Sequence, residues 1–356
     1  KIDEAGWGGT QLGGRRNLII NGAMQVAQRG TSSASGGTNT VDRWNVGGNI
    51  SISQAQSSLS SSDEPYTYGF RNYLRATNTG TTSATNAYAQ FLQKIESQNV
   101  ANSGWNYPSS SSNITLSFWA RSSLAGTYYC DLRSNDGTNQ QYCFAFTLTA
   151  NTWTKITKTV PGDSNLVFNN DNGVGLTVHI WLDLGTDYTD SGTTLNSWAA
   201  FASGNQSPDF VQKWGNTASA TWDITGVQLE VGSVSTPYEH RSYGEELALC
   251  QRYFHRSIGG TIIGAYIDSN RIDATIHFPV TMRATPAMTA SSGTNYWYAY
   301  TGGTPDYFNA WSGAGGASVN NGSMYVSSGE ISGPDNAGCQ ISFSNANAYF
   351  QADAEL

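Results

Sequence analysis

Apolar and polar residues alternate along much of the sequence between residues 17 and 231. Successive side chains of an extended strand point to opposite faces, so this pattern predicts strands with one buried and one solvent-exposed face. In the stretch NITLSFWAR the apolar set is Ile114, Leu116, Phe118 and Ala120, and the other face carries Thr115, Ser117 and Trp119. We expect one strand of a sheet with a solvent-exposed side here.

A longer run of the same kind is VGLTVHIWLDLG at residues 174–185. One face would carry Val174, Leu176, Val178, Ile180, Leu182 and Leu184, and the other Thr177, His179, Trp181 and Asp183. A slip of one residue would turn the whole apolar set to solvent, so the register of this strand is well specified. In DITGVQLEV the alternation resumes with a shifted phase after Gly226, which predicts a β-bulge at that glycine.

Turn residues separate these strands, and helical patterns longer than two or three turns are hard to find. The pattern of residues 17–231 therefore predicts an antiparallel sandwich of jelly-roll type. After Val231 the run GSVSTP ends the last strand, and YGEELALCQRYF has the composition of one short helix. New strands follow in TIIGAYI, RIDATIHFPV and the closing stretch that begins CQISF.

We therefore predict an all-β protein with two antiparallel β-sandwich, jelly-roll-like domains joined by a short helical linker. The expected parts are an N-terminal connector at 1–16, a first sandwich at 17–243, a helical hinge at 244–257 and a second sandwich at 258–356. A length of 356 residues also favours two domains, because one hydrophobic core usually stops growing at ~250–300 residues.

Composition and charge limit the partners. The net charge is −8 and charged residues make up 12% of the chain, so we expect neither nucleic acid nor an anionic membrane as the main partner. No apolar run approaches the ~18 residues of a membrane span, and the first residues lack the layout of a signal peptide. Because the chain begins at Lys1 without a methionine, an upstream segment is compatible with the sequence.

One pair of cysteines has a spacing that invites a geometric test. If Asp136 and Gly137 form a two-residue hairpin turn, Cys130 and Cys143 lie directly opposite each other. The pair would then be either a cross-strand disulfide or two small buried thiols. Cys250 and Cys339 read as ordinary buried thiols.

The sequence shows no local signature of an enzyme. The histidines, His179, His240, His255 and His277, are scattered and fall outside zinc-ligand spacings. Glu245 and Glu246 are adjacent, so on a helix they diverge and cannot flank one glycosidic bond. We expect no catalytic residues, although two carboxylates from distant strands would leave no local motif, so a polysaccharide depolymerase remains an alternative.

The acidic loop DLGTDYTDSG offers Asp183, Asp187 and Asp190, oxygen ligands of the kind that calcium prefers. Their spacing does not match an EF-hand loop. The loop is therefore either a structural Ca²⁺ site or a plain polar turn, and we expect no other cofactor.

The densest aromatic stretch is NYWYAYTGGTPDYFNAW at residues 295–311. Sugar recognition needs aromatic faces beside amides or carboxylates, and the candidate ligand-binding residues are Trp297, Asp306, Tyr307, Asn309 and Trp311. A strand here would bury either Trp297 and Ala299 or the tyrosines between them. The alternative is that these aromatics pack in the core and at a subunit interface.

Several blocks of the chain also resemble tail-fibre or tail-tip proteins of bacteriophages, notably those of marine bacteria and cyanobacteria. The blocks are NLIINGAMQVAQRG, VDRW, ITLSFWARSS, DITGVQLEVGSVSTPYEHRSYGEELALCQRYF and FPVTMRATPAMT. They cover both predicted domains. The resemblance carries no ligand residues and no catalytic signature to this chain.

The resemblance implies a virion location in a tail appendage and a homotrimer that contacts other virion tail proteins. It also implies that the jelly-roll domain at 17–243 is similar to carbohydrate-binding modules and that the C-terminal sandwich at 258–356 is the distal, receptor-binding tip. It implies attachment to a bacterial host surface through cell-surface polysaccharide or lipopolysaccharide, without enzymatic activity. Two alternatives stay open: a glycan depolymerase of the virion, and a purely structural head-decoration or tail-scaffold protein.

Overall fold

A computed structural model describes residues 16–356, so the predicted connector at 1–16 lies outside the described residues except for Arg16. The chain divides into two compact units, residues 1–246 with Leu356 and residues 247–355. The division falls inside helix α3 (Tyr243–Gln251). None of the helices in residues 16–356 has the length and hydrophobicity needed to span a membrane.

Two six-stranded sheets make up the first unit. Sheet A has the order β1-β3-β4-β12-β6-β9, and its strands are β1 (Ser32–Ser33), β3 (Ser51–Ser58), β4 (Asn72–Gly80), β12 (Thr221–Val231), β6 (Asn113–Ser122) and β9 (Thr154–Pro161). Sheet B has the order β11-β8-β7-β10-β5-β2, and its strands are β11 (Trp198–Ala200), β8 (Gln140–Leu148), β7 (Gly126–Ser134), β10 (Val174–Leu184), β5 (Tyr88–Glu96) and β2 (Asn45–Gly48). Short helical turns lie between them: α1 (Glu64–Thr67), α2 (Ser97–Ala101) and η2 (Trp214–Asn216).

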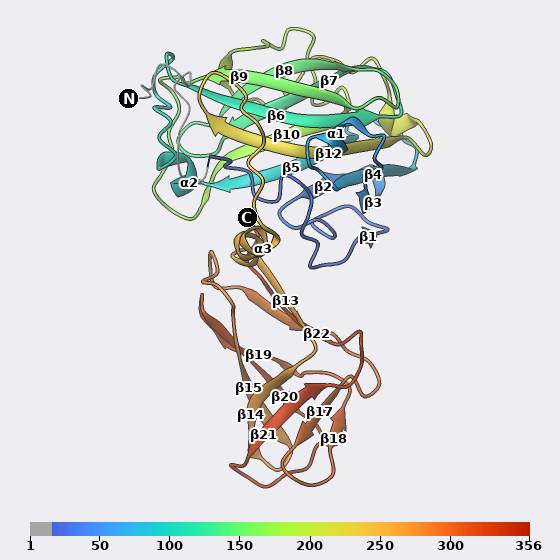
Figure 1. Ribbon diagram of the computed structural model, residues 1–356, viewed down its shortest axis with the longest axis vertical. Coiled ribbons are helices and arrows are strands. Elements are labelled where there is room, and N and C mark those ends of the chain that lie inside the picture. The colour runs from blue at the N-terminus through green and yellow to red at the C-terminus, as the bar shows by residue number, and fades with distance from the viewer. Residues whose placement is uncertain (1–15) are drawn as a thin grey trace. The chain divides into compact units, whose positions relative to one another are not determined.

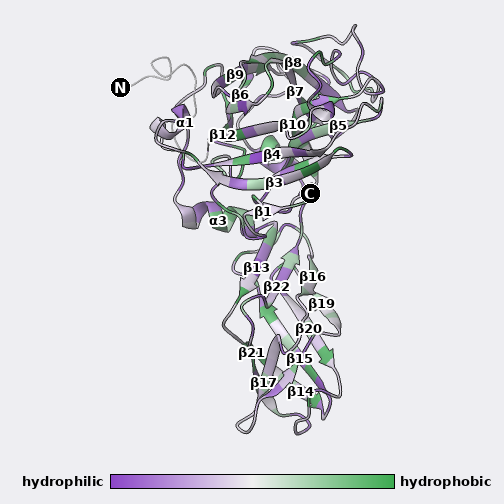
Figure 2. Cartoon of the chain, turned by 90° about the vertical axis from the view of Figure 1, so that its right-hand side faces the viewer, coloured by the Kyte–Doolittle hydropathy of each residue, from purple (hydrophilic) through white to green (hydrophobic). Residues whose placement is uncertain are grey.

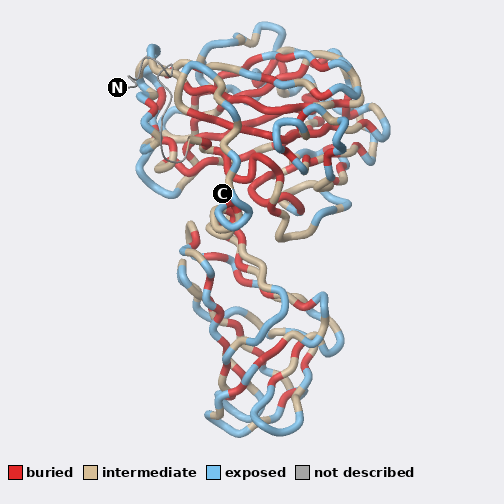
Figure 3. The backbone as a smooth tube through the Cα atoms, in the orientation of Figure 1, coloured by how far each residue is buried: buried red, intermediate tan, exposed pale blue. Residues whose placement is uncertain are grey.

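The chain passes repeatedly from one sheet of this unit to the other (Figure 1), and the described strands of both sheets pair antiparallel, apart from two isolated parallel bridges. The inner faces of both sheets contribute to one core, which Figure 3 shows as buried segments running through the central strands. The predicted all-β sandwich fold of jelly-roll type is therefore confirmed. Figure 2 shows the alternation of hydrophilic and hydrophobic segments along the strands that underlies it.

The predicted bulge lies in β12. The pairing of β12 with β6 shifts register between Thr225 and Gln228, and Gly226 has a φ of +63°. A glycine adopts this left-handed conformation without steric cost, so the sequence places the irregularity at the residue that tolerates it best.

The expectation of a solvent-exposed outer face was wrong for both example strands. On sheet A, Ser117 and Trp119 are buried, because a second apolar cluster, formed by Ala23, Leu59, Phe70, Tyr73, Trp119 and Trp153, covers this face. On sheet B, His179 and Trp181 are buried too. Both donate hydrogen bonds to the Asp131 carboxylate over 2.8 Å.

The loop after β10 crosses the outer face of sheet B. Arg133 donates to the Gln206 side-chain oxygen over 2.9 Å, and Gln141 donates to the Gln206 carbonyl over 2.6 Å. Arg133 also lies over the ring of Phe201 at 3.9 Å. Polar residues on this face are therefore buried by a segment that is distant in the sequence. The local pattern of polar and apolar residues does not indicate such burial.

The β7–β8 hairpin differs from its prediction by one residue. Asp131 pairs with Cys143 and Cys130 pairs with Phe144, and the connection between the strands is longer than two residues. Asp136 instead bridges to Val167 and accepts a hydrogen bond from Ser97. Cys130 and Cys143 thus point to opposite faces of the sheet, and both are free buried thiols.

Two sheets also make up the second unit. The three-stranded sheet has the order β13-β22-β16, with β13 (Phe254–Ile258), β22 (Tyr349–Asp353) and β16 (Ala287–Ala290). The seven-stranded sheet has the order β18-β17-β21-β14-β15-β20-β19, with β18 (Asp306–Phe308), β17 (Trp297–Tyr300), β21 (Gly338–Phe343), β14 (Thr261–Asp268), β15 (Arg271–His277), β20 (Asn321–Ser327) and β19 (Gly313–Ala317). Both sheets contribute to a separate apolar core.

The predicted helix is α3, and its start has a capping box. Ser242 and Glu245 bond reciprocally: the Ser242 backbone N–H donates to the Glu245 carboxylate over 2.9 Å, and the Glu245 N–H donates to Ser242 Oγ over 3.3 Å. The helix ends at Gln251, and residues 254–257, predicted in the helical hinge, belong to β13. Residues 254–258 pair antiparallel with β22, with Phe254 opposite Asp353, and this pairing makes them a strand.

Candidate functional site

The predicted aromatic patch in the second unit divides between interior and surface. In β17, Trp297 and Ala299 are buried, while Tyr300 is exposed. The ring of Trp297 packs against Phe343 and Phe350 at centroid distances of 4.7 and 4.6 Å. The structure thus places Trp297 in the core, where its faces contact other side chains.

The two polar candidates of this patch are held by internal hydrogen bonds. Asp306 Oδ2 accepts the Tyr266 hydroxyl over 2.9 Å, and burial together with this carboxylate raises the pKa of Tyr266. The Asn309 backbone N–H donates to Glu330 over 3.0 Å, and its side-chain oxygen accepts the N–H of Asn295 over 2.8 Å. These hydrogen bonds hold the loops around the aromatic patch in place.

The remaining candidates, Tyr307 and Trp311, differ in exposure. Tyr307 is 45% exposed, and its ring lies 5.7 Å from that of Tyr298, its cross-strand neighbour. Trp311 is half-buried against Trp297, and its Nε1 is buried without a hydrogen-bond partner. The aromatic surface of this patch is therefore formed by the exposed Tyr300 and Tyr307 and the partly exposed Tyr298.

The three candidate calcium ligands are not gathered into one site. Asp183 is buried in β10 and accepts the Gly215 N–H over 2.6 Å, while Asp187 and Asp190 are exposed. Asp190 Oδ1 accepts the Gly192 N–H over 2.7 Å, as in an Asx turn. In the part of the chain that the structure describes, no group of three or more His, Cys, Asp or Glu side chains is placed to hold a metal ion.

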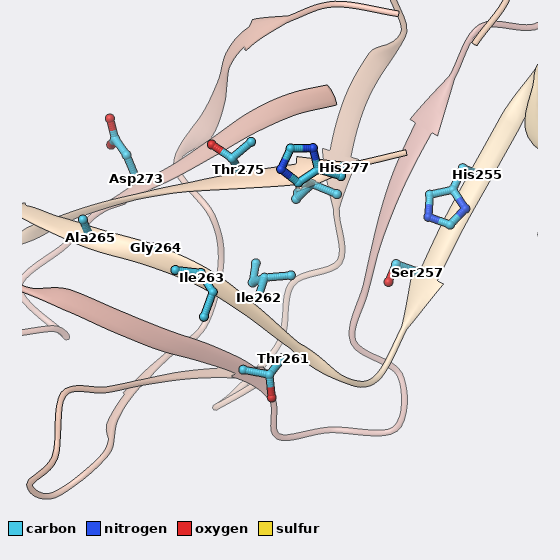
Figure 4. Close-up of a pocket in the computed structure, with 11 residues that line it drawn as sticks. His255, Ser257, Thr261, Ile262, Ile263, Gly264, Ala265, Asp273, Thr275 and His277 are labelled. Carbon is cyan, nitrogen blue, oxygen red and sulfur yellow. The ribbon is translucent and has the colours of Figure 1, made fainter. Parts of the chain in front are cut away.

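A broad hollow of about 670 Å³ lies in the second unit, over β13, β14 and β15. Figure 4 shows that its two histidines come from different strands, His255 from β13 and His277 from β15. Burial lowers the pKa of His255, whose Nδ1 has no hydrogen-bond partner. The exposed Ile263 projects from β14, and the single carboxylate of the lining, Asp273, is paired with Arg271 over 2.9 Å.

A second pocket, of about 390 Å³, opens on the outer face of sheet A in the first unit. We call it the Trp119 pocket. It is lined by Tyr68, Phe70, Ser117, Trp119, Lys155, Gly226, Ser235, Thr236, Pro237, Tyr238 and His240. These residues come from three parts of the chain: the turn after α1, the strands of sheet A, and the segment after β12.

Aromatic rings form two groups around this pocket. Tyr68, 54% exposed, lies over Trp119 with a centroid distance of 5.2 Å and an interplanar angle of 46°. Phe70, Tyr238 and His240 form a mutual cluster with centroid distances of 4.8, 5.2 and 4.9 Å. Aromatic faces of this kind suit the apolar face of a sugar ring.

Local features hold these groups in place. The bulge at Gly226 leaves room for the Phe70 ring, since a Cβ at residue 226 would lie 2.6 Å from Phe70 Cζ. The turn after α1 and the segment after β12 are joined by a hydrogen bond of 2.9 Å between His240 Nε2 and the Tyr68 carbonyl. Glu230 accepts the Thr236 N–H over 2.8 Å and so fixes the start of the second segment.

Two side-chain hydroxyls of the pocket lining have no hydrogen-bond partner among residues 16–356: Ser235 Oγ, which is buried, and Ser117 Oγ. An unpaired buried hydroxyl costs about 1–3 kcal/mol, so a ligand or water that pairs with it is favoured. Burial raises the pKa of Tyr238, which keeps that phenol neutral.

The lining of the Trp119 pocket contains few charged groups. Among the described residues, Lys155 is the one lysine of its lining, and no carboxylate belongs to that lining. Glu246, half of the adjacent acid pair, lies elsewhere: it is buried and accepts the Asn21 N–H over 2.6 Å. Within residues 16–356, neither this pocket nor the hollow of the second unit has two facing carboxylates in its lining.

Little in the sequence points to this pocket. The alternation in residues 113–121 predicts an exposed strand face for Trp119, and the run GSVSTP predicts only the end of a strand. The aromatic residues of YTYGF and TPYEH are the local signal, but nothing in the sequence says that segments about 170 residues apart meet, as the Tyr68–His240 bond shows.

No protein-family model matches the chain, and no curated protein matches it either. Among solved structures, a family 4 carbohydrate-binding module has 14% identity and a TM-score of 0.31, with 60% of this chain and 99% of that chain covered. A family 11 carbohydrate-binding module of Clostridium thermocellum has 12% identity and a TM-score of 0.29, with 58% and 96% covered. A cyclase from Fischerella sp. TAU has 11% identity and a TM-score of 0.33, with 62% and 98% covered. Likenesses this weak assign neither a family nor a function.

Proposed function

We propose that this protein is a non-enzymatic attachment protein that binds carbohydrate of a bacterial cell surface through the Trp119 pocket. The observation that carries the proposal is the combination of the exposed Tyr68 ring, which lies over Trp119, with unpaired hydroxyls in one pocket of about 390 Å³. Aromatic faces bind the C–H surface of a sugar, and the hydroxyls of Ser117 and Ser235 pair with its polar groups.

The proposed setting is a bacteriophage tail fibre or tail tip. Its support is the resemblance of the sequence blocks, two of which, residues 114–123 and 223–254, contribute walls of the Trp119 pocket. In this setting the chain would act as a homotrimer beside other virion tail proteins. Light scattering on the purified protein tests the trimer, and labelling of virions with an antibody against the chain tests the location.

Binding to glycans tests the function itself. The purified chain is titrated with surface polysaccharide and lipopolysaccharide from candidate bacterial hosts and with intact cells. The pocket variant is Tyr68→Ala, which removes an exposed ring that contacts Trp119. Its matched control is Tyr243→Ala, since Tyr243 is similarly exposed at 57% but does not line the pocket.

Saturable binding that Tyr68→Ala weakens about ten-fold or more, and that Tyr243→Ala leaves unchanged, supports the proposal. Binding that both variants retain would exclude this pocket as the site. The surface of Tyr298 and Tyr307 would then be the next candidate. Release of reducing sugar ends during incubation would show a depolymerase. No binding to any host glycan or cell would favour a purely structural virion protein.

A further inference from the structure

We infer that the Trp119 pocket selects an acidic sugar, a glycan unit that carries a single carboxylate, as a uronic acid does. This inference rests on the proposed function and names the ligand class of the same pocket. It is carried by the position of Lys155, by the absence of carboxylates from the lining, and by the two unpaired hydroxyls.

Lys155 is placed beside the aromatic platform by the sheet. It lies on β9 directly opposite Trp119 of β6, so the two side chains project from the same face. Its Nζ lies 6.0 Å from the centroid of the Tyr68 ring. A sugar ring that stacks on the exposed Tyr68 would therefore have its substituents within reach of an ammonium group.

Lys155 has no carboxylate partner among the described residues, although the protein has a net charge of −8. The nearby acids are used elsewhere. Asp63 accepts from Trp153 Nε1 over 3.0 Å and pairs with Arg121 over 3.1 Å. Glu230 accepts both the N–H and the hydroxyl of Thr236, over 2.8 and 2.6 Å.

Among the described residues, the lining thus offers an anion one lysine and no carboxylate. A carboxylate fits a single lysine, which acts as a compact point charge. A phosphate group, with its larger charge, is held better by several cations or by the bidentate guanidinium of arginine. The described lining holds no arginine, and the nearby Arg16 already donates to Thr236 Oγ1 over 2.8 Å and to the Pro237 carbonyl over 3.3 Å. We therefore commit to the carboxylate.

The hydroxyls complete the recognition. Ser117 lies on β6 two residues before Trp119, hence on the same face, and Ser235 lies on the segment that forms another wall. Each can donate one hydrogen bond and accept from a sugar hydroxyl. Ring stacking, two serine hydroxyls and one ammonium group together describe a site for one acidic sugar residue.

The experiment compares ligands that share their sugar rings and differ in whether the carboxyl group is charged. Oligogalacturonate and its methyl ester have the same sugar rings, but only the first carries free carboxylates. Calorimetric titration of the whole chain with both, and with a neutral galactan and a phosphorylated mannan, measures the preference. The variants are Lys155→Gln, which keeps length and polarity, and Lys213→Gln, which removes an exposed lysine outside the pocket.

We expect the free acid to bind about ten-fold more tightly than its ester, with a preference that salt reduces, because one charge-assisted bond is at stake. Lys155→Gln should abolish the preference and leave binding of the ester unchanged, while Lys213→Gln should leave both unchanged. Equal binding of acid and ester, or tighter binding of the phosphorylated mannan, would overturn the inference and leave the proposed function standing. If no carbohydrate of the set or of the host surface binds, both fail.

Discussion

The ring of Phe70 lies against Gly226, so closely that a Cβ on residue 226 would come within 2.6 Å of Phe70 Cζ. Gly226 also has a φ of +63°, a conformation that residues with a side chain rarely adopt. The β-bulge and the aromatic wall of the Trp119 pocket therefore depend on the same missing side chain. One substitution should disturb both.

We expect Gly226→Ala to lower the free energy of unfolding of the first unit by about 1–3 kcal/mol, because it adds backbone strain and displaces Phe70. Glycan binding should weaken in the fraction that remains folded. Denaturant unfolding and calorimetric titration measure the two effects. Gly204→Ala is the control in the same unit, since the nearest atom to its Cβ position lies at an ordinary contact distance of 3.6 Å. A loss as small as the control's would contradict the proposed packing.

The aromatic residues of the second unit should differ in their contribution to the free energy of unfolding according to how far they are buried. Trp297→Ala should cost about 3–5 kcal/mol of unfolding free energy, because it empties the centre of the core formed with Phe343 and Phe350. Tyr307→Ala, at an exposed ring, should change it by less than about 0.5 kcal/mol. Hydrogen exchange of β17 and β21 reads out this unit alone. Similar losses in the two variants would show that Tyr307 also packs against something.

Asp183 should make the first unit more stable in mild acid than a solvated carboxylate would. Burial raises the pKa of Asp183, so the folded chain takes up this proton at a higher pH than the unfolded chain. Its contribution to the free energy of unfolding therefore rises as the pH falls through the raised pKa. Asp183→Asn mimics the protonated form and can still accept the Gly215 N–H, so it should raise the melting temperature at neutral pH.

Calcium provides the matching test of the same residue. With Asp183 inside the sheet and Asp187 and Asp190 exposed, added Ca²⁺ or a chelator should leave the melting temperature unchanged. A rise with Ca²⁺ that Asp183→Asn removes would restore the calcium site that the acidic loop predicted.

His255 should weaken the second unit in acid. Burial lowers the pKa of His255, so the folded chain keeps the imidazole neutral while the unfolded chain protonates it below its ordinary value of 6.5. The free energy of unfolding therefore falls as the pH drops from about 6.5 toward the lowered pKa. His255→Leu should flatten this dependence, as followed by hydrogen exchange of β13 and β22.

The control for that experiment is His277→Leu, at an exposed histidine of the same hollow. It should leave the acid sensitivity of β13 unchanged. If the sensitivity survives in His255→Leu, another group accounts for it.

The sequence by itself determined the features that depend on a residue and its immediate neighbours. Alternation predicted that Trp297 and Ala299 would share one face of a strand, and both are buried on it. The shifted phase after Gly226 predicted the bulge, and the acidic start of YGEELALC predicted the helix. A strand's pleat and a bulge are local, so a local pattern reports them.

Tertiary structure alone decided what covers each face and which segments meet. The predicted pairing of Cys130 with Cys143 was wrong because the hairpin connection is longer than the two residues assumed. A register shift of one residue moves every side chain of a strand to the opposite face. Trp119 and His179 are buried because chain from other parts of the sequence lies over them, at a distance that periodicity cannot see. The Trp119 pocket has the same origin, since Tyr68 and His240 come together only when the outer face of sheet A is covered.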